Sequence, residues 1–158
     1  MSVNPELLDT VFEPTEPYVV GREKVREFAS AVFATSPIHH DVDAAVAAGY
    51  SDVVAPPTFP IVIQEKTLQQ LLSHPGAGID FSRVVHGDQK FDYQRPLVAG
   101  DEVVATLRVT KIQSLGGHTM VTSESTISTT AGETVVVATP PSLFVERRVR
   151  DVDTVGGV

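Results

Sequence analysis

The hydrophobic and polar residues of this chain follow two different periods, one in each half. From Pro60 to Leu72 the apolar positions recur at helical spacing, and four of them form one stripe at about 100° per residue: Ile61, Leu68, Leu71 and Leu72. Pro60 suits the first position of a helix, and Thr58 can cap the same end. The pattern predicts a long helix that is enclosed at its apolar beginning by other elements, although an ordinary amphipathic core helix would give the same stripe.

Two shorter helices are predicted before this one. Apolar residues recur at helical spacing over residues 22 to about 33. Residues 42–48 form a short helix that Asp41 can cap and Gly49 can end. The segment 34–41 contains a proline, which disfavours helix at the residue before it, so we predict a loop there.

From Ser82 to Val149 the pattern becomes that of β-strands. Four apolar residues alternate with polar neighbours, as in a half-buried strand: Val103, Ala105, Leu107 and Val109. Turns are predicted where Pro and Gly gather, at residues 96–101, 116–117 and 131–132. Pro140 and Pro141 cannot lie in a central strand, so they mark a bulge or a sheet edge.

Helices followed by an antiparallel meander indicate the α+β class, with a curved antiparallel sheet wrapped round the long helix. We predict a single domain over residues 1–150 and a frayed tail over 151–158. Residues 18–20 add a short strand, and the acidic, proline-containing residues 1–17 form an arm over the domain. Because a single curled sheet keeps an open edge, a dimer or a two-fold repeat is expected.

Composition narrows the possible partners. The 158 residues include 12 Lys+Arg and 20 Asp+Glu, which gives a net charge of −8 and argues against a nucleic-acid partner. The chain has no cysteine, so disulfides and thiolate chemistry are excluded. The sequence carries neither the pattern of a signal peptide nor an apolar run long enough to span a membrane, and we predict a cytoplasmic protein.

Two stretches carry a family resemblance: FASAVFATSPIHHDVDAAVAAGYSDVVAPPTF at residues 28–59, and RVVHGDQKFDYQRPLVAGDEV at 83–103. Together with the strand meander that follows, they resemble the MaoC-like hot-dog proteins, the family of (R)-specific enoyl-thioester hydratases and (3R)-hydroxyacyl-thioester dehydratases. The resemblance spans roughly residues 8–147. It is strongest to the N-terminal-type domain, which includes the non-catalytic A-subunit-like partner of type II fatty-acid dehydratases and uncharacterised actinobacterial relatives.

The resemblance implies syn addition or removal of water across the double bond of an acyl thioester. This chemistry needs a carboxylate, an imidazole and a backbone donor for the thioester oxygen. The family motif Asp-x-Asn-Pro-x-His aligns with this chain so that His39 is the imidazole, Ser36 stands at the asparagine and Ala34 at the aspartate. Pro57 stands at the glycine whose N–H polarises the thioester carbonyl, and proline has no N–H. His39 is therefore the catalytic candidate of a chain that lacks the carboxylate and the donor.

The same resemblance assigns substrate-binding positions to Ser36, Pro57, Thr58, Phe59, His86, Gly87 and Gln89. Strand alternation places His86 and Asp88 on one face and Gly87 with Gln89 on the other. An alternative interpretation is that His86 and Gln89 tie the strand to the preceding loops by buried hydrogen bonds. Asp41 matches the family's helix cap rather than the missing carboxylate.

Three functions remain open from the sequence. The first is a hot-dog subunit that binds an acyl thioester and pairs with itself or with a catalytic hot-dog chain. The second is an acyl-CoA thioesterase, for which Glu65 is the only carboxylate on the long helix. The third is a non-enzymatic acyl-thioester or protein-binding module. The histidines lack metal-ligand spacing and no nucleotide fingerprint is present, so we expect no metal and no cofactor beyond the substrate's carrier, coenzyme A or acyl carrier protein.

Overall fold

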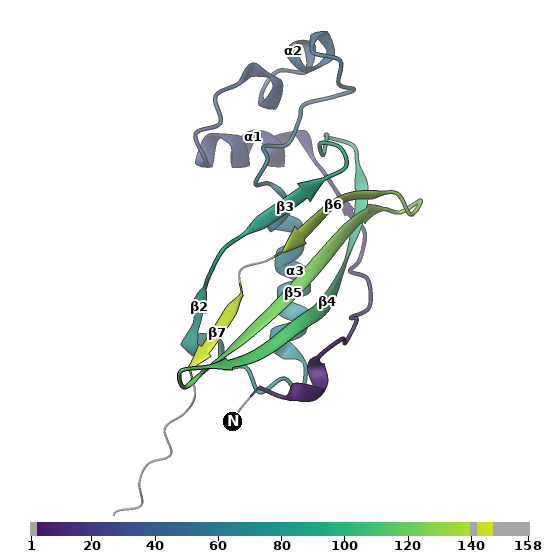
Figure 1. The fold of residues 1–158 in the computed structure, drawn as a ribbon. Helices are drawn as coiled ribbons and strands as arrows, with labels where there is room; N and C mark the ends of the chain where they lie inside the picture. Colours follow the sequence, from purple (N-terminus) through teal and green to yellow (C-terminus); the bar gives the residue numbers. More distant parts are fainter. Residues whose placement is uncertain (1–2, 140–141, 147–158) are drawn as a thin grey trace, which may run out of the picture.

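The computed structural model describes residues 3–139 and 142–146, and shows a curved antiparallel sheet wrapped round one long helix (Figure 1). The helix is α3 (Pro60–Ser73). The strands are β1 (Tyr18–Val19), β2 (Val84–His86), β3 (Lys90–Tyr93), β4 (Glu102–Leu115), β5 (His118–Thr129), β6 (Thr134–Thr139) and β7 (Leu143–Glu146). Their order is β1-β4-β5-β6-β3, and β7 joins β5 to β2. The α+β class and the sheet curled round the helix are both confirmed. The predictions for Pro140, Pro141 and the tail fall outside the described residues.

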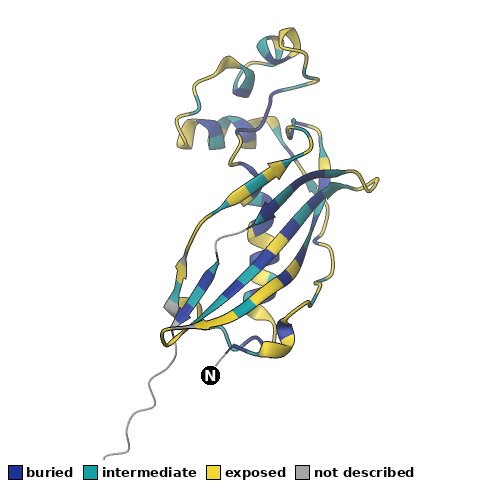
Figure 2. Cartoon of the chain, viewed as in Figure 1, coloured by how far each residue is buried: buried dark blue, intermediate teal, exposed yellow. Residues whose placement is uncertain are grey.

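Three short helical elements gather at one end of the sheet, on the side from which the chain enters α3 (Figure 1). They are α1 (Arg22–Ala31), the 3₁₀ helix η2 (Pro37–His39) and α2 (Val42–Ala47), and we call them the helical end. As predicted, Asp41 caps α2, because its Oδ1 accepts the Ala44 N–H at 3.0 Å. Gly49 follows α2 with φ +96°, a conformation that glycine adopts at little cost. Figure 2 shows that this end is more exposed than the inner strands of the sheet.

The long helix begins as predicted at Pro60, but Thr58 does not cap it. The N-cap residue is Phe59, which already has helical backbone angles and makes no side-chain capping bond. Thr58 contributes its carbonyl instead, which accepts the Ile61 N–H at 3.2 Å. The helical turn therefore extends back past the proline, and the Thr58 hydroxyl is not needed.

The buried face of α3 also differs from the predicted stripe. Leu68 and Leu71 are buried as expected, whereas Ile61 is 43% exposed. The buried positions of the helix are Pro60, Ile63, Gln64, Thr67, Leu68 and Leu71. Two of these are polar, so a pattern drawn through apolar residues alone places the stripe on the wrong side of the first turn.

The two polar residues belong to a layer that crosses the middle of the core, which we call the polar belt: Gln64, Thr67, Gln89 and Ser125. Thr67 Oγ1 lies 2.9 Å from Ser125 Oγ and donates to the Gln64 carbonyl at 2.7 Å. Gln64 Nε2 donates to Gln89 Oε1 at 2.8 Å. One hydrophobic cluster around Phe59 and another around Leu107 lie in the rest of the core. Because buried polar groups cost free energy unless paired, these bonds fix how α3 sits on the sheet.

The Thr67–Ser125 pair gives a stability prediction. Thr67→Val leaves the fully buried Ser125 hydroxyl without this partner, and should lower the free energy of unfolding by about 1–3 kcal/mol. Adding Ser125→Ala removes the orphaned group, so the double variant should be less destabilised than the sum of the two single variants. Urea unfolding of the four proteins measures this coupling. Strict additivity would show that the hydroxyls do not stabilise each other.

The two edges of the sheet are treated differently. The predicted N-terminal arm runs along β4 and makes ladder-like bonds to it, among them Asp9 N–H to the Val109 carbonyl at 2.9 Å and Phe12 N–H to the Leu107 carbonyl at 2.8 Å. At the other edge, β3 ends the strand order and β2 pairs only with β7 among the described residues. Val85 on β2 is 67% exposed. This edge is the open one.

Candidate functional site

The helical end brings His39 to the segment that leads into α3. The ring is 8% exposed, and its Nδ1 lies 2.6 Å from the Val54 carbonyl oxygen. Val54 N–H in turn donates to the Ile38 carbonyl at 2.9 Å. Since a carbonyl can only accept, Nδ1 carries the proton and Nε2 is left as the basic nitrogen of the neutral ring. His39 thus holds η2 against residue 54 through this hydrogen bond, which we call the staple, and the same bond fixes the tautomer of its imidazole.

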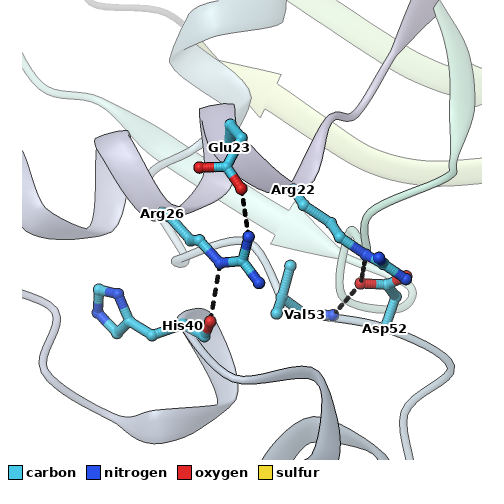
Figure 3. A network of polar contacts seen from close by, with 6 residues as sticks. All are labelled: Arg22, Glu23, Arg26, His40, Asp52 and Val53. Carbon is cyan, nitrogen blue, oxygen red and sulfur yellow. Dashed lines mark hydrogen bonds and ion pairs between the residues drawn. The ribbon is translucent and has the colours of Figure 1, made fainter.

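Two arginines of α1 hold the segments that contain His40 and Asp52 (Figure 3). Arg22 makes a bidentate pair with Asp52, with Nε–Oδ1 at 2.9 Å and Nη2–Oδ2 at 2.8 Å. Arg26 Nε donates to the His40 carbonyl at 2.8 Å and also pairs with Glu23. The helix α1 is therefore tied both to residue 40, beside His39, and to the segment before Val54. The sequence gives no local signal for this clamp, because Arg22 and Asp52 are 30 residues apart.

The Arg22–Asp52 pair makes the stability of the fold depend on pH. Hydrogen bonds from the Arg22 guanidinium lower the pKa of the Asp52 carboxyl below its usual value. A lowered pKa stabilises the fold above the unfolded-state pKa of about 3.9, and that stabilisation is lost as the pH falls through the folded-state value. The melting temperature of Arg22→Gln should therefore lie below that of the wild type near pH 6, and the gap should close below about pH 4.

The exposed pair of Lys24 with Glu27, on the same helix, supplies a matched control. Lys24→Gln should change the melting temperature little at either pH, because exposed ion pairs contribute little. A gap between wild type and Arg22→Gln that stays constant down to pH 2.5 would contradict the role of the Asp52 carboxylate.

The positions that correspond to the family's carboxylate and donor have other roles here. Ala34 has only a methyl group, and its carbonyl accepts from His40 Nε2 at 2.8 Å. Ser36 is exposed and makes no side-chain capping bond at the start of η2. Asp41 is engaged as the cap of α2. Among these residues, His39 is the one group of the expected dyad that the chain retains.

The segment 55–59 lies across β3. Pro57 and Thr58 are exposed, whereas Phe59 is fully buried with its ring edge-on to Phe28 at 5.3 Å between centroids. The Pro57 carbonyl accepts from the Tyr93 hydroxyl at 2.7 Å. Burial raises the pKa of Tyr93, so the hydroxyl remains a donor at neutral pH. Sequence reasoning missed Tyr93, which has no spacing relation to Pro57 that a motif could reveal.

The second predicted group lies further along the edge strand. Gly87 faces a close neighbour, since a Cβ there would be 3.2 Å from Phe144 Cε2. Gln89 pairs with Gln64 and donates to the Thr139 carbonyl at 2.9 Å. Gln89 makes structural hydrogen bonds as the alternative interpretation expected, but its partners lie on the helix α3 and on β6 rather than on the preceding loops. The backbone of His86 pairs with Leu143, and its side chain lies outside the described residues.

The two groups are not brought together at one point. Gln89 directly precedes β3 and Tyr93 is the last residue of that strand, so the two lie at its opposite ends, about 13 Å apart in an extended chain. The first group consists of His39 with the 55–59 segment, and of the second group Gln89 belongs to the polar belt. Glu65, the carboxylate proposed for a thioesterase, is exposed and accepts from Gln69 Nε2 at 2.8 Å. It therefore lies off the buried face of α3.

An antiparallel sheet curled round one long helix is the hot-dog fold, and here the helical end adds a buried histidine next to the segment that leads into that helix. The sequence pattern of the FAS1-like dehydratase domain region matches residues 8–138. UPF0336 protein Lxx02810 of Leifsonia xyli subsp. xyli is 65% identical over 136 residues, which are 86% of this chain and 91% of the relative. A UPF0336 protein of Streptomyces avermitilis is 46% identical over 87% of this chain and 92% of its own length.

Superposition on solved structures points to the same family as the sequence relatives. The C-terminally truncated HadBC (3R-hydroxyacyl-ACP dehydratase) complex from Mycobacterium tuberculosis superposes with a TM-score of 0.80 at 27% identity, over 87% of this chain and 96% of that one. A MaoC-like dehydratase superposes with a TM-score of 0.81 at 33% identity, over 89% of this chain and 42% of the other. The chain belongs to the MaoC-like hot-dog family of dehydratases and hydratases, together with the UPF0336 proteins.

In the described part of the chain, no helix is long and apolar enough to cross a bilayer.

Proposed function

We propose that this chain is the non-catalytic partner subunit of a two-chain (3R)-hydroxyacyl-thioester dehydratase or (R)-enoyl-thioester hydratase of fatty-acid metabolism. It binds and orients the acyl chain of a thioester, and a second hot-dog chain supplies the acid–base residues. The observation that carries the proposal is the pair Ala34 and Pro57, a methyl group and a proline where the family's chemistry needs a carboxylate and an N–H donor.

The contacts around the two positions support this assignment. A dehydration needs two proton transfers, which the family assigns to a histidine and a carboxylate. His39 has Nε2 for one of them, but position 34 is an alanine and supplies no carboxylate for the other. The Pro57 carbonyl is held by Tyr93, and an acceptor at that point cannot stabilise negative charge on a thioester oxygen. Lack of one oxyanion donor costs about 10²–10³ in rate, and lack of an acid–base group about 10²–10⁴.

The open sheet edge supports a partner of the same fold. An edge strand offers its outward N–H and C=O groups as a template for another strand, and among the described residues the opposite edge is covered by the N-terminal arm. HadBC and ChsH1–ChsH2, both from M. tuberculosis, are complexes of two different chains, and the second superposes with a TM-score of 0.62 at 22% identity. We place the pair in the cytoplasm, with a substrate carried on coenzyme A or acyl carrier protein.

The proposal is tested by hydration of crotonyl-CoA. The substrate is given to the isolated chain, to a hot-dog chain of the same genome that carries the complete Asp-x-Asn-Pro-x-His motif, and to their mixture. The isolated chain should show no turnover above background, and the mixture should exceed the catalytic chain alone. Robust turnover by the isolated chain would overturn the partner-subunit assignment. Equal rates with and without this chain would overturn its role in substrate binding.

A thioesterase would instead need a carboxylate that handles water. The exposure of Glu65 and its bond to Gln69 argue against that role. Loss of acyl-CoA hydrolysis in Glu65→Gln would reinstate it.

A further inference from the structure

The helix α1 ends in a Schellman motif with an unusual residue at its key position. Ala34 N–H donates to the Ala29 carbonyl at 2.8 Å and Phe33 N–H to the Ser30 carbonyl at 3.3 Å, the two bonds that define the motif. Phe33 takes the left-handed position, with φ +58°. Glycine usually fills this position, because a Cβ there is strained. The predicted helix therefore ends earlier than residue 33, at Ala31.

The side chain of Phe33 is also in an unfavourable place. It is 86% exposed, more than any other large hydrophobic residue in the described part of the chain. Its ring takes part in neither of the two aromatic pairs found there. A glycine would remove both the backbone strain and the exposed ring. The isolated chain thus derives no benefit from a phenylalanine at this position.

The loop that presents Phe33 is held in place. The carbonyl of the next residue, Ala34, accepts from His40 Nε2, and the His40 carbonyl is bonded by Arg26. Phe33 directly precedes Ala34, the position of the missing catalytic carboxylate. The ring is therefore next in the chain to residues 34–39, the segment that aligns with the family's acid–base motif.

We propose that Phe33 is an aromatic anchor that inserts into a pocket of the catalytic hot-dog partner, beside residues 34–39 of this chain. This inference rests on the proposed function. A protein occupant fits better than the acyl chain, because ligand sites are concave and this ring protrudes. Aromatic residues, phenylalanine among them, are enriched at protein interfaces, where they fill pockets of the partner. The strain and the exposure of the free chain are then offset by burial of the ring in the pair.

Two substitutions separate the ring from the backbone. Phe33→Gly removes the ring and the strain, so the melting temperature of the isolated chain should rise by about 2–4 °C while the dissociation constant for the catalytic chain rises about 30-fold. Phe33→Ala removes the ring but keeps the left-handed Cβ, so it should weaken the pair by a similar factor with little gain in melting temperature. Leu8→Ala is the matched control, since Leu8 is also an exposed apolar residue, 47% exposed, but belongs to the N-terminal arm along β4, and it should change neither quantity.

The outcomes distinguish this inference from the proposed function. Calorimetric titration of the catalytic chain with each variant gives the dissociation constants, and sedimentation of each variant alone reports self-association. Pairing by the wild type that Phe33→Gly leaves unchanged would overturn the anchor and keep the partner-subunit proposal. No pairing by the wild type would overturn both. Self-association that is lost in Phe33→Gly would identify a second copy of this chain as the occupant and overturn the catalytic partner.

Discussion

Removal of the catalytic imidazole from the partner chain should lower crotonyl-CoA hydration by the two-chain enzyme by about 10²–10⁴-fold, whereas His39→Asn in this chain should change it by less than about threefold. The asparagine amide can take the place of Nδ1–H and still donate to the Val54 carbonyl, but it has no counterpart of the basic Nε2. His39→Asn therefore keeps the staple and removes the only group of the dyad that this chain retains.

His39→Leu completes the comparison, because it removes the donor as well. The Val54 carbonyl then loses its partner, and the free energy of unfolding should fall by about 1–3 kcal/mol. Steady-state rates of the paired enzyme and urea unfolding of each variant measure the two effects. A loss of 100-fold or more in rate for His39→Asn, with stability unchanged, would make His39 a catalytic base and contradict the structural role.

Phe59→Ala should lower the free energy of unfolding by about 3–5 kcal/mol, the largest stability effect we expect from a single substitution. Its ring is fully buried, packs edge-on against Phe28 of α1 and lies in the cluster that joins the sheet to the first turn of α3. The cavity left by the ring would lie between α1, α3 and the sheet. Each of these is held by its own hydrogen bonds, so the cavity cannot collapse easily. The helical end should become looser together with the core.

Ile61→Ala, two residues further along the chain, is the control for Phe59→Ala. Ile61 is 43% exposed, so its truncation should cost less than about 1 kcal/mol. Denaturant unfolding monitors global stability, and hydrogen exchange of the α1 amides follows the helical end. A cost for Phe59→Ala similar to that for Ile61→Ala would show that the first turn of α3 is not anchored as described.

The features of the fold that were predicted correctly have local signals. Asp41 caps α2 and Pro60 begins α3 because each satisfies or avoids backbone groups within one turn. The glycine turn at 116–117 needs positive φ at both residues, and both have it. Such signals act within a few residues, so a single sequence is sufficient to place them.

The errors arise where distant residues decide the local structure. Gln64 and Thr67 are buried only because Gln89 and Ser125 supply partners from the sheet, so the apolar pattern of α3 could not reveal its inner face. Phe33 has helical spacing with the apolar residues of α1, yet it lies outside the helix and is exposed.

The sequence predicted only part of the candidate site, because the rest again depends on contacts between residues that are far apart in the chain. Alignment of the family motif located His39 and the two departures at Ala34 and Pro57. The contacts that give these positions their present roles come from Val54, His40 and Tyr93, through folding rather than spacing. The roles of Ser36, Thr58 and the other proposed substrate-binding residues remain predictions.

The central claim is that this chain is one half of a two-chain hot-dog unit. Native mass spectrometry of the chain mixed with the catalytic hot-dog chain of its own genome tests it most directly. We expect a 1:1 pair at micromolar concentration that persists when His39 is replaced by asparagine. A chain that stays monomeric in the mixture, or that forms only dimers of itself, would contradict the claim.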